Sequence, residues 1–246
     1  MTIQTLLLDI LKQCNIAKID VLKISSLPDQ KLRIQTYDAD RVLFIDATTH
    51  DSYPEFTGEF GLFNFKILKG LLTLSSFQSD SATFTIGTRK IDGKDYPDRI
   101  EFKGGGSKAT FRMMSKEVVP EQPTIVNIPW DITLNPSPSK LAEFQQMAGL
   151  YSDVEGLFTV STQDDNLIVD FGTDSASTHS ATMTLAEEIN GSLVSEMRFP
   201  IDKFTMLMKS ANDANASDLK FTSKGLLGVI ATTDHATYNY YVKKSL

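Results

Sequence analysis

Residues 29–34 read DQKLRI, and residues 164–169, which lie 135 positions further along the chain, read DDNLIV. Each segment is a polar turn followed by alternating apolar and polar residues, the pattern of a strand that buries one face. More matches follow in the same order: residues 66–67 with 203–204, 84–85 with 221–222, and 109–111 with 236–238. The last offset is shorter because the first half has a longer polar segment at 89–99. The shared order indicates an internal duplication.

Each half reads as a helix, several strands, a second helix and several further strands. The strands alternate in polarity, so the sequence predicts antiparallel sheets that carry a pair of helices on one side of each domain, an α+β architecture. A polar segment with Pro120 and Pro123 separates the halves. We therefore expect a first domain at 1–114, an interdomain connector at 115–123 and a second domain at 124–246.

The composition is that of an ordinary globular protein, with 41% hydrophobic and 22% charged residues in a chain of 246. No stretch approaches the roughly 20 apolar residues that span a bilayer. The opening Met1 to Cys14 segment contains three leucines, but it lacks a basic start and includes Asp9, so we interpret it as a helix and not as a secretion signal. Cys14 is the single cysteine, which excludes an internal disulfide. A cytosolic protein is expected.

Lysines concentrate on the expected outer faces of four amphipathic helices. Helical-wheel spacing buries Ile67, Leu68, Leu71 and Leu72 in the second helix, and Ser137 with Pro138 predicts the start of the third. The exposed lysines are Lys12, Lys66, Lys69, Lys140, Lys203 and Lys209. Against them stand Asp9, Glu143 and Asp202, a balance of +3 in a chain of net charge −7, which leaves −10 for the remainder. The total charge disfavours a nucleic-acid partner, but its distribution permits a weakly positive helix surface.

Four short segments together give the sequence a family resemblance: YDADRV at 37–42, KILK at 66–69, PEQ at 120–122 and YYV at 240–242. With the duplication and the length, the chain resembles the DNA sliding clamps, particularly those of T-even-type bacteriophages and more distantly the proliferating cell nuclear antigen of eukaryotes. The resemblance implies a closed homotrimeric ring, six domains around a hole that the helices line. It implies a processivity factor without enzymatic activity that encircles double-stranded DNA independently of sequence, tethers the replicative DNA polymerase and is placed by a clamp loader.

The resemblance also implies specific site residues. The six lysines would face the DNA. A hydrophobic peptide of a partner would insert between the domains, at a pocket formed by Tyr37, Val42, Val118, Val119, Tyr241 and Val242. Neighbouring subunits would join the strand around 109–113 to the strand around 180–184, through Ala109, Phe111, Met113, Ser180, Thr182 and Thr184. For a bacteriophage protein, the location would be the cytoplasm of the bacterial host, with no membrane partner.

Two other classes of protein stay open, and no cofactor is expected. A duplicated α+β module could serve only as a structural or virion assembly protein, or an enzyme could use an unfamiliar site. The segment Gly104 to Lys108 has the wrong spacing for a phosphate-binding loop, and none of the three histidines has a ligand-spaced partner for a metal. The pair Asp164 and Asp165 is better explained as a solvated turn than as catalytic carboxylates. No catalytic or metal site is predicted.

Overall fold

The computed structural model describes residues 2–14, 19–79, 81–91, 93–123, 127–172, 179–212 and 216–245. The chain divides into two compact units. Unit 1 comprises Met1–Ala39, Ile45–Pro123 and Thr233–Tyr238, and unit 2 comprises Asp40–Phe44, Thr124–Thr232 and Asn239–Leu246. The expected connector thus groups with unit 1, while residues 124–126, the expected start of the second domain, lie outside the described residues.

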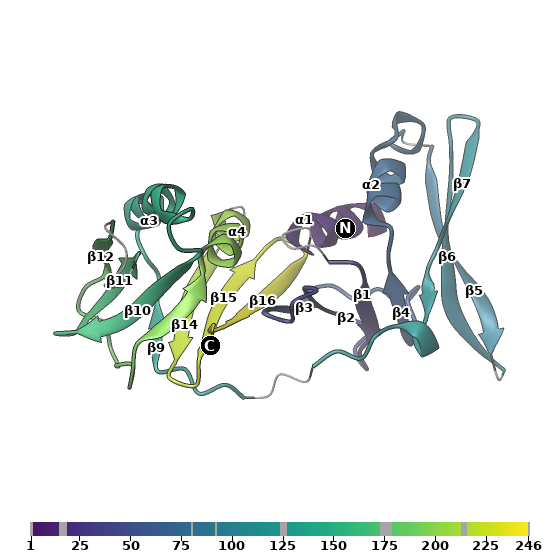
Figure 1. The fold of residues 1–246 in the computed structure, drawn as a ribbon. Coiled ribbons are helices and arrows are strands. Elements are labelled where there is room, and N and C mark those ends of the chain that lie inside the picture. The colour runs from purple at the N-terminus through teal and green to yellow at the C-terminus, as the bar shows by residue number, and fades with distance from the viewer. Residues whose placement is uncertain are drawn as a thin grey trace. The chain divides into compact units, whose positions relative to one another are not determined.

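Unit 1 combines two helices with two groups of strands. Its elements are α1 (Ile3–Cys14), β1 (Leu22–Ser26), β2 (Leu32–Tyr37), β3 (Leu43–Thr49, from Ile45 on), β4 (Glu59–Leu62), α2 (Phe65–Thr73), η1 (Ser75–Phe77), β5 (Thr83–Ile91), β6 (Lys94–Gly104), β7 (Ser107–Arg112), β8 (Met114–Ser115) and η2 (Lys116–Val118). The strand orders are β8-β4-β1-β2-β3 and β5-β6-β7. The long β5-β6 hairpin contains the extra polar segment at 89–99 (Figure 1).

Unit 2 repeats this plan. Its elements are β9 (Ile132–Leu134), α3 (Pro138–Tyr151), β10 (Leu157–Gln163), β11 (Asn166–Phe171), β12 (Ala181–Ala186), β13 (Met197–Pro200), α4 (Ile201–Asn212), β14 (Ala216–Thr222), β15 (Leu226–Thr232) and β16 (Ala236–Lys243, from Asn239 on). The strand orders are β12-β11-β10-β13 and β16-β15-β14-β9. From α3 to β16 the elements follow one another as they do from α1 to β7.

Backbone geometry supports the duplication at single-residue resolution. Gln30, in the turn between β1 and β2, has φ 62°, and Asp165, in the turn between β10 and β11, has φ 60°. These two residues are separated by the offset of 135 that the sequence comparison gives. The predicted α+β class with antiparallel sheets and four helices is confirmed for the described part of the chain.

Each unit buries its own apolar core. In unit 1, α1 packs against α2 and contributes Leu6, Ile10 and Cys14, all at most 1% exposed. Burial, together with the charge of Asp9, raises the pKa of the Cys14 thiol well above its usual range. In unit 2, Phe144 of α3 and Phe204 of α4 meet edge to face with ring centroids 4.6 Å apart, an arrangement that aromatic pairs favour.

The third helix begins as the sequence predicts. The Ser137 hydroxyl accepts a hydrogen bond from the Lys140 backbone N–H at 3.3 Å, and Pro138 occupies the first helical position. Such a cap satisfies a donor that the helix itself leaves without a partner. Among the described helices, none has the length and apolar character required to cross a membrane.

Candidate nucleic-acid interface and docking surfaces

Three of the predicted lysines lie on the two helices of unit 1. Lys12 is exposed in the last turn of α1, and Lys66 and Lys69 are exposed one turn apart on α2. Lys66 and Lys69 also border a hollow of about 240 Å³ whose other lining residues are Leu11 and Phe65. Neither lysine forms an ion pair with another described residue, so their ammonium groups are available to an anion. This face can attract phosphate without fixing it in place.

The helices of unit 2 are less positive than those of unit 1. Lys140 is half-buried, and its Nζ lies 3.2 Å from a carboxylate oxygen of Glu143 on the same helix. Lys203 is half-buried on α4, where Asp202 occupies the first turn, and Lys209 is exposed in the last turn. Because an adjacent carboxylate offsets part of the lysine charge, unit 2 presents a weaker cationic face.

Two residues on these helices differ from their expected positions. Ile67, predicted to be buried, is 56% exposed, because α2 buries Leu68 and Leu72 and this narrower face leaves Ile67 outside. Asp9, predicted to be exposed, is half-buried and accepts hydrogen bonds from the Thr233 hydroxyl at 2.9 Å and the Tyr238 hydroxyl at 2.8 Å. Asp9 therefore tethers α1 to a segment more than 220 residues away.

In unit 1, a hollow lies where the sequence predicts part of the peptide pocket. Tyr37, at the end of β2, and Pro120 and Gln122 of the connector line a hollow of about 130 Å³. Val118 is 63% exposed at the end of η2. Val119 is half-buried close to Gly61, where an added Cβ would come within 2.8 Å of the valine side chain. The role of Tyr37, Val118 and Val119 in peptide binding stays a prediction.

The expected pocket residues of unit 2 include one that does not reach the surface. Val242 is 0% exposed, because successive strand residues point to opposite faces and its face belongs to the core. Its neighbour Tyr241 stacks on Trp130, with ring centroids 6.3 Å apart and an interplanar angle of 4°. The carbonyl oxygen of Val42 accepts a hydrogen bond from the Lys243 backbone N–H at 2.9 Å. The Val242 side chain is thus a core residue in this structure and not a peptide contact.

The two strands expected at subunit boundaries are both edge strands. Among the strands that the structure describes, β7 ends the order β5-β6-β7 and β12 ends the order β12-β11-β10-β13, so each has an open side there. Phe111 and Met113 are 4% and 8% exposed, whereas Thr182 of β12 is exposed. Phe111 thus lies on the buried face of its sheet, and Thr182 lies on the exposed face of its own sheet. Met183 and Leu185 are the inward-pointing residues of β12 that correspond to Phe111.

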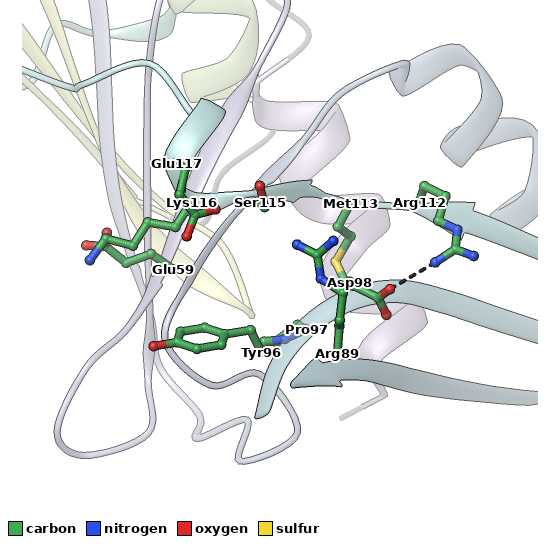
Figure 2. A pocket seen from close by; sticks show the side chains of 10 residues that line it. All are labelled: Glu59, Arg89, Tyr96, Pro97, Asp98, Arg112, Met113, Ser115, Lys116 and Glu117. Atoms are coloured by element: carbon green, nitrogen blue, oxygen red, sulfur yellow. Dashed lines mark hydrogen bonds and ion pairs between the residues drawn. The ribbon is translucent and has the colours of Figure 1, made fainter. Parts of the chain in front are cut away.

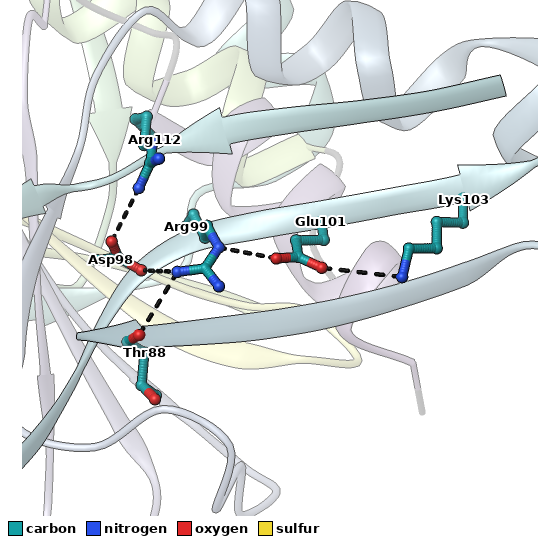
Figure 3. A network of polar contacts seen from close by, with 6 residues as sticks. All are labelled: Thr88, Asp98, Arg99, Glu101, Lys103 and Arg112. Atoms are coloured by element: carbon teal, nitrogen blue, oxygen red, sulfur yellow. Dashed lines mark hydrogen bonds and ion pairs between the residues drawn. The ribbon is translucent and has the colours of Figure 1, made fainter. Parts of the chain in front are cut away.

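The three-stranded sheet of unit 1 has a charged surface that the sequence analysis missed. Arg99 of β6 donates to Glu101 at 2.7 Å and to Asp98 at 2.8 Å, and Arg112 of β7 donates to Asp98 at 2.9 Å (Figure 3). The Arg99 guanidinium can lie there because Gly87 on β5 has no side chain; a Cβ would come within 2.6 Å of it. The sequence signal for this surface is the pair Arg99 and Arg112, which lie outside the four amphipathic helices.

Comparison with solved structures places both units in one known fold. The chain is similar to the proliferating cell nuclear antigen (PCNA) of A. fulgidus, in a structure with the C-terminal region of FEN-1 bound, at a TM-score of 0.70 and 11% identity over 100% of this chain and 97% of that chain. It is similar to PCNA from Entamoeba histolytica at a TM-score of 0.66 and 15% identity, covering 99% and 96% of the two chains. A PCNA2–PCNA3 complex from Sulfolobus tokodaii gives a TM-score of 0.65 and 16% identity, covering 98% and 96%.

These matches define the class: the protein has the DNA-clamp fold over its whole length. The predicted fold is confirmed. No protein-family model matches the sequence, and a search of the curated proteins finds no match either. At 11% to 16% identity, the likeness concerns the fold and does not extend to individual site residues.

Proposed function

We propose that this chain is one subunit of a ring-shaped sliding clamp that encircles duplex DNA and tethers the replicative polymerase. The observation that carries the proposal is the clamp fold across 100% of the chain and 97% of a solved PCNA chain. A clamp needs a weakly positive inner face and a topological link, since tight phosphate contacts would prevent sliding. The exposed Lys66 and Lys69 in a protein of net charge −7 meet this requirement. The proposal assigns no enzymatic activity to the chain.

The open edges of β7 and β12 support assembly into a closed ring. Inside unit 1 the N–H of His50, the residue after β3, donates to the carbonyl of His235, the residue before β16, at 2.9 Å, and inside unit 2 the Lys243 N–H donates to the Val42 carbonyl at 2.9 Å. By the duplication, β12 is the equivalent of β3, and β7 is the equivalent of β16. The same pairing between β12 of one copy and β7 of the next would continue the sheets and cover both edges.

Exposed apolar side chains accompany both edges. The helix α2, which packs beside β7, is followed by Leu74 at 45% exposure and carries Ile67 at 56%. The helix α3, which packs beside β12, carries Leu150 at 74% exposure, and Val154 follows at 43%. Burial of such residues against a second copy would stabilise the assembly by roughly 25 cal/mol per Å² of apolar surface. A homotrimer of 27.3 kDa chains is the expected particle.

The remaining parts of the proposal concern partners and origin. A hydrophobic peptide of the polymerase would dock beside the connector, where Tyr37 and Pro120 line a hollow and Val118 is exposed. A clamp loader would open the ring. The T-even-type resemblance of the sequence supports a bacteriophage protein that acts in the cytoplasm of its bacterial host.

Threading onto linear DNA tests the topological link directly and needs no loader. The protein is incubated with a linear duplex that carries biotin at both ends, streptavidin is then added to block the ends, and the salt concentration is raised. We expect retention at high salt only on blocked DNA, because salt weakens phosphate contacts but not encirclement. Equal retention on open and blocked DNA would mean ordinary binding, and release from both would exclude a ring, leaving a purely structural assembly protein.

A further inference from the structure

The three-stranded sheet β5-β6-β7 has a charge opposite to that of the protein. Its strands contain seven lysines and arginines and three aspartates and glutamates, a net charge of +4 in a chain of −7. The polar face of the sheet presents Arg99, Lys103 and Arg112, whereas Ile100, Phe102 and Phe111 occupy the other face. A concentrated positive surface on an acidic protein attracts anions from solution.

Carboxylates on and beside this sheet are already engaged by cations. Asp98 accepts from both Arg99 and Arg112, and Glu101 lies between Arg99 and Lys103, with separations of 2.7 and 3.9 Å (Figure 3). The hydrogen bond from Arg99 lowers the pKa of Glu101. Each of these carboxylates has two cationic neighbours. The surface therefore keeps an excess of positive charge at neutral pH.

Glu59 of β4 is another carboxylate that lies between two cationic side chains. Its carboxylate oxygens lie 3.4 Å from Lys23 and 3.3 Å from Lys116. Burial raises the pKa of Glu59, but the hydrogen bonds and charges of the two lysines outweigh it and hold the pKa below the usual range.

A hollow of about 190 Å³ lies where this sheet meets β4, β8 and η2. Figure 2 shows Arg89 reaching from β5 into the hollow, with Tyr96, Pro97 and Met113 among the lining residues. Arg89 makes no hydrogen bond or ion pair with another described residue. Its guanidinium can form a bidentate pair with an incoming carboxylate. The volume is below the roughly 300–1,000 Å³ of small-molecule pockets, so side-chain insertion suits it better.

We propose that this hollow is a docking site for an acidic peptide segment of a partner protein, with one carboxylate on Arg89 and an apolar side chain against Met113 and Tyr96. A nucleic-acid backbone fits less well, because it carries a charge at every phosphate and would meet Glu59, Asp98 and Glu117 in the same lining. A peptide can space its carboxylates so that one reaches Arg89. The inference goes beyond the proposed clamp function and does not depend on it.

The test measures fluorescence anisotropy of a labelled peptide in which glutamates flank a leucine, with the full-length protein at low salt. The key variant is Arg89→Gln, and the matched control is Lys90→Gln, the next residue on β5, which is exposed but does not line the hollow. We expect Arg89→Gln to weaken peptide binding about tenfold, the loss of one charge-assisted contact, and Lys90→Gln to change it less than about twofold. The glutamine version of the peptide should bind as weakly as the glutamate peptide binds to Arg89→Gln.

Three outcomes would overturn the proposal. Equal weakening by the two variants would mean attraction by overall charge instead of a site. Unchanged binding by Arg89→Gln would place the peptide elsewhere. A single-stranded oligonucleotide that displaces the peptide and binds more tightly to this hollow would make it a nucleic-acid site. Loss of DNA threading with peptide binding intact would refute the clamp function alone, so the two proposals fail separately.

Discussion

The ammonium group of Lys140 lies 3.2 Å from the carboxylate of Glu143, one helical turn further along α3. In unit 1, Lys66 and Lys69 of α2 have no such pair among the described residues. Exposed pairs of this kind contribute only about 0.3–0.5 kcal/mol to stability. Their larger consequence is electrostatic: the proposed DNA-facing surface is uneven, with unit 1 more attractive to phosphate than unit 2.

Replacing Glu143 with Gln should strengthen retention on DNA. The change removes one negative charge per chain and frees Lys140 for phosphate. In the threading assay, the salt concentration that releases the protein from open-ended DNA should rise. The control is Glu187→Gln, an exposed site outside the helices, which should leave the release point unchanged. An equal rise for both variants would show that only net charge matters.

Reversing Lys66 and Lys69 to glutamate should abolish retention on blocked DNA while leaving the fold intact. Both side chains are exposed, and surface substitutions usually change the free energy of unfolding by less than about 0.5 kcal/mol. Thermal melting checks the fold, and a salt series of the threading assay checks the function. The same reversal at Lys31 and Lys90 serves as the outer control. If inner and outer variants behave alike, the helices do not face DNA.

Replacing Leu150 with Asp should break the assembly into single chains. Leu150 is 74% exposed beside the open edge of unit 2, and a carboxylate there would be desolvated in the proposed interface. Light scattering gives the particle mass. Val194→Asp introduces the same charge at a residue 88% exposed on a loop of unit 2 and should leave the mass unchanged. Intact assembly of the Leu150 variant would place the subunit contact elsewhere.

Replacing Val118 with Glu should weaken capture of the cognate polymerase without affecting the particle mass. Val118 is 63% exposed, so the change disturbs little packing. Val119 and Tyr241 are poorer test sites, because one packs close to Gly61 and the other stacks on Trp130. A pull-down with immobilised polymerase measures the effect. Wild-type capture by the variant would argue against docking beside the connector.

Replacing Asp9 with Ala should lower the free energy of unfolding by about 1–3 kcal/mol, because the hydroxyls of Thr233 and Tyr238 would lose their common acceptor. Urea denaturation measures the loss. Asp9→Asn keeps one acceptor oxygen and should lose less. Equal stability of the alanine variant and the wild type would mean that these hydrogen bonds do not hold α1 in solution.

The fold could be predicted because the sequence pattern of turns, strands and helices that indicates it occurs twice in the chain. The turns at Gln30 and Asp165 match in sequence position and in backbone conformation. The burial of individual side chains was predicted less well where contacts with residues distant in the sequence determine it. Asp9 was assigned by helical spacing alone, which contains no information on Thr233 or Tyr238. Val242 has an apolar side chain that suits a peptide pocket equally well, and only strand alternation in the folded sheet shows that it points inward.

The different identities of the two open edges limit how copies can join. In the proposed assembly β7 of one chain would pair with β12 of the next, so the contact would be heterologous: no two-fold axis would relate the partners, and each chain added would leave one edge of each kind open. The addition of chains ends in a closed ring only when the rotation that relates one chain to the next is a whole-number fraction of a full turn. Closure then depends on the angle at which the edges meet. A substitution that alters this angle by a few degrees would convert a finite particle into an open spiral filament without weakening a single contact.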